Sequence, residues 1–264
     1  NLLYEAFGWE VPTYVHCSPV MRDAQNKMSK RHGDPSYEDL RAQGFLTEAI
    51  LNYVALLGWS PRGDIAEQEV FSLQELAKAF DLAGMSKSPA IFDIEKLTHF
   101  NAIYLRAMAP EAFADVARPY IRQAVQREDI SADDIAALLQ ARCEKLTDIP
   151  EKVDFFDALP DYDVNLFANK KSKSTLDSSR EMLSAAIGML ANLPSWSEAM
   201  IHDSLVGLAE GLGVKNALLM WPVRIAAAGK SVTPGGAVEI CHILGREETV
   251  RRLKLGLDKL SSFS

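Results

Sequence analysis

Residues Thr47–Gly58 read Thr-Glu-Ala-Ile-Leu-Asn-Tyr-Val-Ala-Leu-Leu-Gly, and this run decides the fold class. Its apolar residues Ile50, Tyr53, Val54 and Leu57 recur at helical spacing, which places them on one face of an α-helix. We expect the helix to stop at Gly58, because glycine can take the left-handed conformation that ends a helix. The run therefore predicts an amphipathic helix, and similar patterns recur along most of the chain.

Several other helices are predicted by capping boxes or by apolar spacing. In a capping box a serine hydroxyl accepts from the amide three residues on, and the acid there bonds back. The pattern occurs at Ser36/Asp39, Ser72/Glu75, Ser131/Asp134 and Ser195/Glu198. Helical spacing predicts further helices after Asp93, over Leu176–Leu190 and over Glu247–Leu260.

Only the beginning of the chain differs from this helical pattern. Residues Thr13–Met21 are rich in β-branched and aromatic side chains and predict a short strand. A polar loop from Arg22 to Arg31 follows that strand. Breaks near residue 110, at 150–163 and at 229–236 indicate boundaries between helical units.

Length and composition are those of an ordinary globular protein. The 264 residues, 48% hydrophobic and 24% charged, suffice for two or three compact units. No apolar run approaches the length that spans a bilayer, so we expect a cytoplasmic protein without membrane contact. Cys17, Cys143 and Cys241 lie far apart, without zinc-site spacing, so we expect no metal.

The net charge of −8 counts against a general nucleic-acid binder. Basic residues nevertheless gather at 22–31, 170–173 and 246–259, which allows one positive face on an acidic protein.

The five residues Lys27–Arg31, Lys-Met-Ser-Lys-Arg, carry the strongest chemical signal. Two lysines and a hydroxyl on a polar loop suit a pyrophosphate leaving group, because negative charge builds on the phosphates during attack at the α-phosphorus. By itself, such a stretch equally describes a solvated surface loop. The surrounding sequence distinguishes the two interpretations.

The chain resembles the glutamyl enzymes of the class I aminoacyl-tRNA synthetase family in several segments that follow in order. Lys27–Gly33 is similar to their form of the KMSKS motif, and Gly44–Ser60 is similar to their next characteristic segment. Phe92–Arg106 and Pro222–Glu247 are similar to two later segments. The resemblance covers nearly the whole chain.

The resemblance implies a mainly α fold: a remnant of the class I catalytic domain and a stem-contact fold, followed by two helical anticodon-binding domains. We expect residues 1–32 to end the catalytic domain, 33–106 to form the stem-contact domain, and 107–164 and 165–264 to form the two helical domains. No HIGH motif precedes the Lys27–Arg31 loop. We therefore expect the catalytic half to lie before Asn1 and this chain to be inactive alone.

Residue roles in ATP binding follow from the resemblance alone. Lys30 would contact the ATP phosphates, while Lys27 and Ser29 would help to hold the closed loop. Met28 and Arg31 would complete the ATP site. ATP, with Mg²⁺ in the complete enzyme, is the expected cofactor.

Residue roles in tRNA binding are implied in the same way. Arg142 would read the third anticodon base, which separates glutamate from glutamine tRNAs. Arg224, Thr233, Pro234 and Gly236 correspond to the other anticodon-contacting positions, although the family often has a larger apolar residue in place of Gly236. Without the resemblance, Arg142 would be interpreted as an exposed arginine at a helix end.

The implied function is that of a glutamate–tRNA ligase, which activates glutamate with ATP and transfers it to tRNA(Glu). We expect a monomer. Two alternatives stay open: a free-standing tRNA-binding or regulatory module without catalysis, and a non-discriminating enzyme that also charges tRNA(Gln). Arg142 counts only slightly against the second, since one contact contributes about 1–3 kcal/mol of base discrimination.

Overall fold

The computed structural model describes residues 1–262 and is mostly helical, which confirms the mainly α fold class. The α-helices are α1 (Leu2–Phe7), α2 (Tyr37–Ala42), α3 (Thr47–Gly58), α4 (Leu73–Ala79), α5 (Ile94–Ala107), α6 (Pro110–Ala124), α7 (Ala132–Leu139), α8 (Ile149–Val153), α9 (Leu176–Ala191), α10 (Glu198–Gly211), α11 (Asn216–Ala228), α12 (Ala237–Leu244) and α13 (Arg246–Ser261). The strands are β1 (Val20–Met21) and β2 (Ala90–Ile91). Within residues 1–262, no helix is long and apolar enough to cross a membrane.

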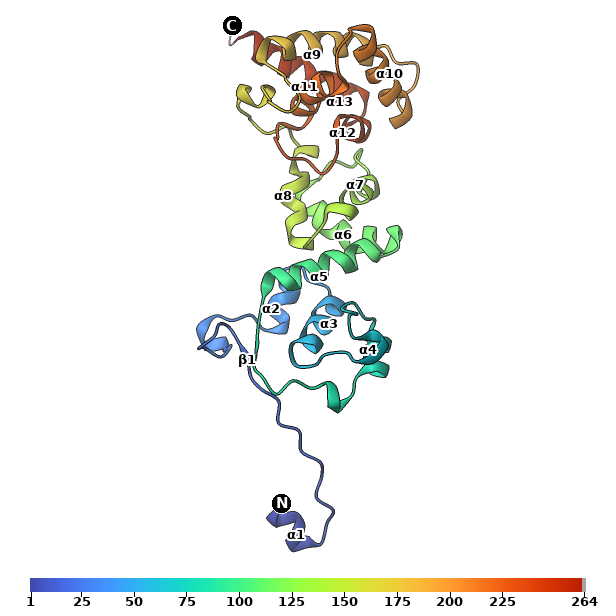
Figure 1. Cartoon of the computed structure of the whole chain (residues 1–264). Coiled ribbons are helices and arrows are strands. Elements are labelled where there is room, and N and C mark those ends of the chain that lie inside the picture. The colour runs from blue at the N-terminus through green and yellow to red at the C-terminus, as the bar shows by residue number, and fades with distance from the viewer. Residues whose placement is uncertain (263–264) are drawn as a thin grey trace. The chain divides into compact units, whose positions relative to one another are not determined.

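The chain forms two compact units, residues 1–104 and residues 105 onward. In the first unit, helices α2, α3 and α4 pack with the start of α5 around an apolar core (Figure 1). Leu40, Tyr53, Leu97 and Phe100 lie in this core, almost fully buried. Ile50, Tyr53 and Leu57 of α3 thus supply one wall of the core as predicted, whereas the prediction is wrong for Val54, which is 48% exposed.

Two buried asparagines also hold the first unit together. The Asn101 side chain accepts a hydrogen bond from the Leu46 amide at 2.8 Å, and the Asn52 side chain accepts one from the Phe71 amide at 2.6 Å. Both asparagines are fully buried, so these bonds satisfy polar groups that would otherwise be costly inside a core.

The strand predicted over Thr13–Met21 is wrong in extent. Only Val20 and Met21 form a strand, which pairs in parallel with Ala90 and Ile91. Residues 13–19 have no strand partner among the described residues, so their β-forming composition is not used for pairing.

The prediction that Gly58 takes a left-handed conformation is also wrong. The helix α3 ends at Gly58, but Gly58 has no positive φ, and the next residue, Trp59, is extended with φ −142°. Trp59 leaves the helix in this direction and becomes buried, with its ring 6.1 Å from the ring of Phe71. Burial of the indole therefore ends the helix, in place of a glycine cap.

Most predicted helix starts are present. Ser36 and Ser72 form complete capping boxes, and Ser131 accepts from the Asp134 amide. At α10 the predicted cap, Ser195, is wrong. Ser197 caps that helix by accepting from the Met200 amide, because α10 begins at Glu198.

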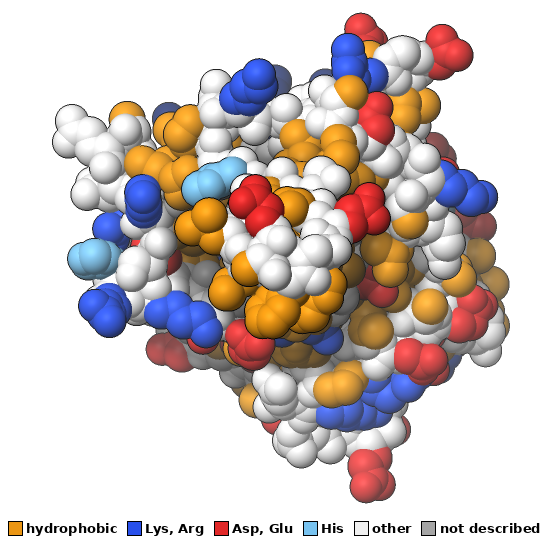
Figure 2. Space-filling view, turned by 90° about the horizontal axis from the view of Figure 1, so that it is seen from below, with side chains coloured by type: hydrophobic (Ala, Val, Ile, Leu, Met, Phe, Trp, Pro, Cys, Tyr) orange, Lys and Arg blue, Asp and Glu red, His pale blue; other side chains and the backbone are white. Residues whose placement is uncertain are grey.

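The first residues of the chain expose apolar side chains. Leu2, Leu3, Phe7 and Trp9 are each more than half exposed, and the rings of Phe7 and Trp9 stack 4.9 Å apart. Figure 2, which views the molecule from below, shows hydrophobic side chains gathered among acidic ones on that face.

In the second unit, α9, α11 and α13 pack together, and α10 and α12 lie against α11 (Figure 1). Helices α6, α7 and α8 form a neighbouring group, which contacts the first group through α7 and α12. Neither α6 nor α11 is among the helices predicted above. Each contains a proline, Pro119 or Pro222, and proline inside a helix is normally a sign of interruption.

A buried arginine joins the two helix groups of the second unit. Arg252 of α13 is fully buried, and its Nη1 donates to the carbonyls of Phe155 at 2.6 Å and Ala227 at 2.8 Å. Its Nε donates to Glu248 at 2.5 Å. Removing one partner would leave a buried charge or carbonyl unpaired, which costs free energy of folding. These bonds therefore hold α13 in place.

Candidate functional site

The loop that carries Lys27–Arg31 is closed at its base by backbone hydrogen bonds. The Arg22 amide donates to the Asn26 carbonyl at 2.8 Å, and the Met28 amide donates to the Val20 carbonyl at 3.1 Å. The loop therefore begins at the end of β1 and folds back beside that strand.

Asp34 holds the second half of this loop. Its carboxylate accepts from the Ser29 amide at 2.7 Å and lies 3.7 Å from Nε of Arg22. The Ser29 hydroxyl accepts from the Arg31 amide at 3.3 Å and so caps a short 3₁₀ helix, Lys30–His32. The local sequence gives no sign of this role for Asp34, because the contact depends on how the loop folds back.

The cationic side chains of the loop are exposed. Lys27, Lys30 and Arg31 are exposed, while Met28 and Ser29 are partly buried. No ion pair formed within residues 1–262 involves these three cations. The loop can therefore present three positive charges to one polyanion, and it is not packed away as a rigid buried element.

A second candidate site lies in the second unit, around Arg224 of α11. The guanidinium of Arg224 donates to Oγ1 of Thr233 at 2.8 Å and to the carbonyl of Ser231 at 2.9 Å. The same group lies over the ring of Trp221, 4.5 Å from its centroid, in a cation–π contact. Burial lowers the pKa of Arg224 from its ordinary value.

Arg224 thereby shapes the segment Ser231–Gly236, which we call the 231–236 loop. Within it, Oγ1 of Thr233 donates to the carbonyl of Gly235 at 2.7 Å. Pro234 and Gly235 are buried, whereas Thr233 and Gly236 are partly exposed. The loop leads directly into α12.

Arg142 reaches the same loop from the other helix group. It lies in a 3₁₀ turn, Gln140–Arg142, directly after α7, and it is exposed. Its Nη1 donates to the carbonyl of Pro234. The structure thus brings Arg142, Arg224, Thr233, Pro234 and Gly236 together at one loop, although Arg142 is distant from the others in sequence.

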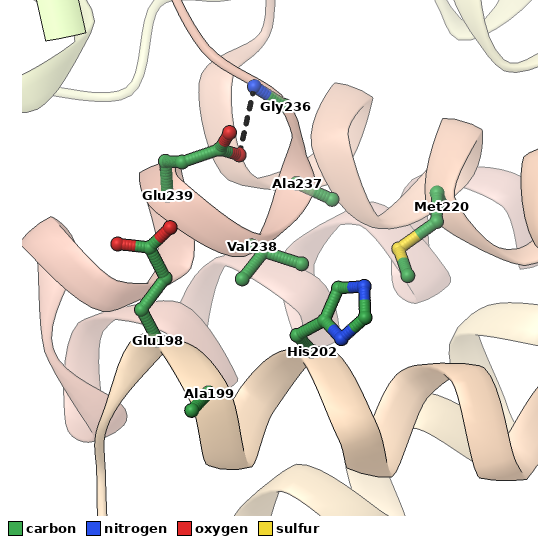
Figure 3. A pocket seen from close by; sticks show the side chains of 8 residues that line it. All are labelled: Glu198, Ala199, His202, Met220, Gly236, Ala237, Val238 and Glu239. Carbon is green, nitrogen blue, oxygen red and sulfur yellow. Dashed lines mark hydrogen bonds between the residues drawn. The ribbon is translucent and has the colours of Figure 1, made fainter.

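Two hollows adjoin this loop. The first, of about 620 Å³, is shown in Figure 3; the second, of about 340 Å³, is lined in part by Lys171, Trp221 and Arg224. Met220, Gly236 and Ala237 line both hollows. The residues that line the first hollow are Glu198, Ala199, His202, Met220, Gly236, Ala237, Val238 and Glu239.

Gly236 is the position at which the resemblance leads us to expect a larger apolar residue. Its amide donates to Oε2 of Glu239 at 3.1 Å, as Figure 3 shows, and a Cβ at position 236 would lie 2.9 Å from that oxygen. A larger residue would therefore displace the Glu239 carboxylate. With glycine, the backbone itself borders both hollows.

The two ends of this surface differ in charge. Glu198 and Glu239 line the first hollow, whereas Lys171 and Arg224 line the second. Since carboxylates repel anionic groups, the second hollow is the better side for a polyanion.

The sequence matches two protein families. Residues 112–257 match the family described as "Anticodon binding domain", and residues 1–99 match "tRNA synthetases class I (E and Q), catalytic domain". The second match extends through most of the segment in which we predict the stem-contact domain, and the division at residue 33 stays a prediction.

Individual relatives agree with these matches. The chain is 46% identical over 262 residues to the glutamate–tRNA ligase of Clostridium tetani, covering 99% of this chain and 53% of that protein. It is 47% identical to the glutamate–tRNA ligase of Clostridium botulinum strain Hall over the same shares. The chain thus spans about half the length of the curated relatives it matches.

Solved structures show the same fold. A glutamate tRNA ligase from Elizabethkingia meningosepticum, in complex with its amino acid, matches with a TM-score of 0.81 and 29% identity, over 98% of this chain and 54% of that one. The glutamate–tRNA synthetase of Elizabethkingia anophelis matches with a TM-score of 0.78 and 28% identity, over 97% of this chain and 53% of that one.

Proposed function

This chain belongs to the anticodon binding domain family, and from that membership we propose that it is the part of a glutamate–tRNA ligase that closes over ATP and holds tRNA. The complete enzyme would activate glutamate with ATP and transfer it to tRNA(Glu). The observation that carries the proposal is that Arg142 and Arg224, each expected to contact the anticodon, bind the same 231–236 loop.

In the proposed reaction, the Lys27–Arg31 loop stabilises the leaving pyrophosphate. Lys30 contacts the β- and γ-phosphates of ATP, and Lys27 and Arg31 add positive charge around them. Their exposure supports this role, because exposed cations are free to move toward a polyanion. Ser29 keeps the loop closed by binding Asp34 through its amide and Arg31 through its hydroxyl.

ATP would arrive with Mg²⁺, which binds phosphate oxygens readily and shields their charge. The loop residues fit such a ligand, since Lys27, Lys30 and Arg31 are cations that would face the outer phosphate oxygens. Each would stabilise the charge that grows on the pyrophosphate as it leaves.

In tRNA binding, we assign the third anticodon base to Arg142 and another anticodon base to Arg224 and Thr233. A guanidinium can pair with a base edge or stack on a base of a single-stranded loop. In this arrangement Pro234 is buried, so it contributes its carbonyl to Arg142 and shapes the loop. Gly236 lines both hollows, where a base would lie against its backbone.

The remaining parts of the proposal are less specific. We propose that the protein acts as a monomer in the cytoplasm, and that residues 107–164 and 165–264 act as two successive anticodon-binding domains. The free-standing module and the non-discriminating enzyme stay alternative predictions.

The proposal is tested by equilibrium binding of the chain to tRNA transcripts at one fixed salt concentration. We expect tighter binding to tRNA(Glu) than to tRNA(Gln), and roughly a 5- to 150-fold loss when the third anticodon base is changed, as expected for one lost base contact. Arg142→Gln should remove most of that difference. Equal binding of tRNA(Glu) and an unrelated tRNA would refute the function, while equal binding of tRNA(Glu) and tRNA(Gln) would support the non-discriminating alternative.

A further inference from the structure

Gly235 lies so close to the end of the Leu138 side chain that a side chain at position 235 would require either Leu138 or the loop to move. A Cβ at position 235 would lie 2.7 Å from Cδ1 and 2.9 Å from Cδ2 of Leu138. Gly235 has no positive φ, so its backbone conformation is open to other residues. A side chain at position 235 would therefore disturb the contact with Leu138, and not the backbone conformation.

This contact locates the 231–236 loop on the helix that leads to Arg142. Leu138 belongs to α7, and Arg142 follows about one turn later in the chain. Gly235 directly follows Pro234, whose carbonyl accepts from Arg142. A shift of Gly235 away from Leu138 would therefore move the Pro234 carbonyl away from Arg142.

The other end of the loop is fixed from α11. Arg224 donates to Thr233, and Thr233 donates to the Gly235 carbonyl. Three consecutive residues, Thr233–Gly235, thus connect the two arginines. Movement of Gly235 would therefore change the contacts that both arginines make with the loop.

We propose that Gly235 is a positioning residue for Arg142: because it lacks a side chain, the 231–236 loop rests on Leu138, and the Pro234 carbonyl orients the Arg142 guanidinium toward an RNA base. This inference rests on the proposed function. A guanidinium has five N–H donors, and the bond to Pro234 takes one, so the others are available for a base. A planar group held at one nitrogen presents the remaining donors in a defined direction, which bidentate base pairing requires.

The experiment measures third-base discrimination, the ratio of Kd values for tRNA(Glu) with a changed third anticodon base and for the unchanged tRNA. Gly235→Ala should reduce this ratio about 5-fold or more, toward the value of Arg142→Gln. Adding Arg142→Gln to Gly235→Ala should change it little further, because both act on the same contact.

Removing the obstacle should restore the site. Leu138 is partly exposed, so Leu138→Ala is tolerated, and the pair Gly235→Ala with Leu138→Ala should recover discrimination to within about 2-fold of the parent. Gly207→Ala is the matched control. Gly207 is exposed in α10, and a Cβ there would meet no atom within 4 Å.

If Gly235→Ala does not fold, Leu138→Phe imposes the same displacement from the opposite side and should cause the same loss of discrimination. The inference is overturned if Gly235→Ala, or Leu138→Phe in its place, leaves discrimination intact while Arg142→Gln abolishes it. It is also overturned if the tested variant weakens binding of the unchanged and the changed tRNA(Glu) equally, which would indicate a structural role alone. If Arg142→Gln itself has no effect, the proposed role of Arg142 fails instead.

Discussion

The guanidinium of Arg224 donates a 2.8 Å hydrogen bond to Oγ1 of Thr233, and the same oxygen donates at 2.7 Å to the carbonyl of Gly235. The Thr233 hydroxyl therefore has both its donor and an acceptor position in use. Arg224 also lies over the ring of Trp221. One face of its guanidinium plane therefore contacts Trp221, and the edge of the plane is hydrogen-bonded to Thr233 and Ser231.

Arg224→Lys is expected to weaken binding of tRNA(Glu) by the chain. Lysine keeps the charge but loses the fork that binds Thr233 and Ser231 and the flat group that lies over Trp221. A hydrogen bond to a charged group contributes about 1.5–3 kcal/mol, so we expect a loss of roughly 10- to 150-fold if the group acts in binding. Thr233→Val should cause a smaller loss of affinity. In the double variant, the loss of binding free energy should be smaller than the sum of the two single losses. Unchanged affinity in both single variants would exclude this site from RNA binding.

Lys30→Ala is expected to slow glutamyl-adenylate formation by the complete enzyme, with little change in tRNA affinity. The reason is that Lys30 would act on charge that develops during the reaction, and loss of one such contact costs about 10²–10³ in rate. Glutamate-dependent pyrophosphate exchange measures this step. Lys78→Ala, at an exposed lysine of α4, is the matched control and should have no effect. An unchanged rate in Lys30→Ala would mean that the loop does not bind the phosphates.

Asp34→Ala is expected to loosen the Lys27–Arg31 loop without unfolding the first unit. It removes the acceptor of the Ser29 amide and the partner of Arg22. Hydrogen exchange should therefore become faster at residues 22–33 and stay the same in α3. Asp64→Ala removes an exposed aspartate of the same unit, whereas Asp34 is partly buried, and serves as the control. If exchange in the loop is unaltered, Asp34 does not hold it.

Glu248 is expected to make the second unit less stable at acid pH. Hydrogen bonds from Arg251, together with Arg252, lower the pKa of Glu248 from its ordinary value of 4.5 to about 2. A carboxyl whose pKa is lowered in the folded state stabilises that state above its unfolded pKa, and this stabilisation is lost as the pH falls through the folded pKa. The loss due to Glu248 should therefore run from about pH 4.5 down to about pH 2.

The measurement is the free energy of urea unfolding between pH 7 and pH 2 for the parent and for Glu248→Gln. The variant should be less stable at pH 7, and the difference between the two proteins should shrink as the pH falls. A difference that is constant with pH would mean that ionisation of Glu248 does not contribute.

Much of the helical structure could be predicted from local sequence, because caps and apolar spacing act within a few residues. The capping boxes at Ser36 and Ser72 are present as predicted. The helices α6 and α11 were missed because Pro119 and Pro222 weigh against a helix locally, whereas burial of their apolar faces outweighs that cost. Gly58 was misjudged for a related reason: the burial of Trp59 sets the end of α3.

The candidate site was predicted residue by residue only through the resemblance. Charge and composition alone left Lys27–Arg31 as a solvated loop and Arg142 as a helix-end arginine. Asp34 and Gly235 were given no role. In the structure, Asp34 accepts from the Ser29 amide of the Lys27–Arg31 loop, and Gly235 follows Pro234, whose carbonyl accepts from Arg142.

By itself, the sequence determined the helical character of the chain, the order of its motifs and the chemical type of each candidate group. The tertiary packing of the chain is what brings Arg142 and Arg224 to one loop, Leu138 against Gly235, and Asp34 to the Ser29 amide. The two differ in the separation along the chain over which the interactions act. Helix formation depends on neighbours three or four residues away, whereas these contacts join residues whose proximity depends on how whole helices pack.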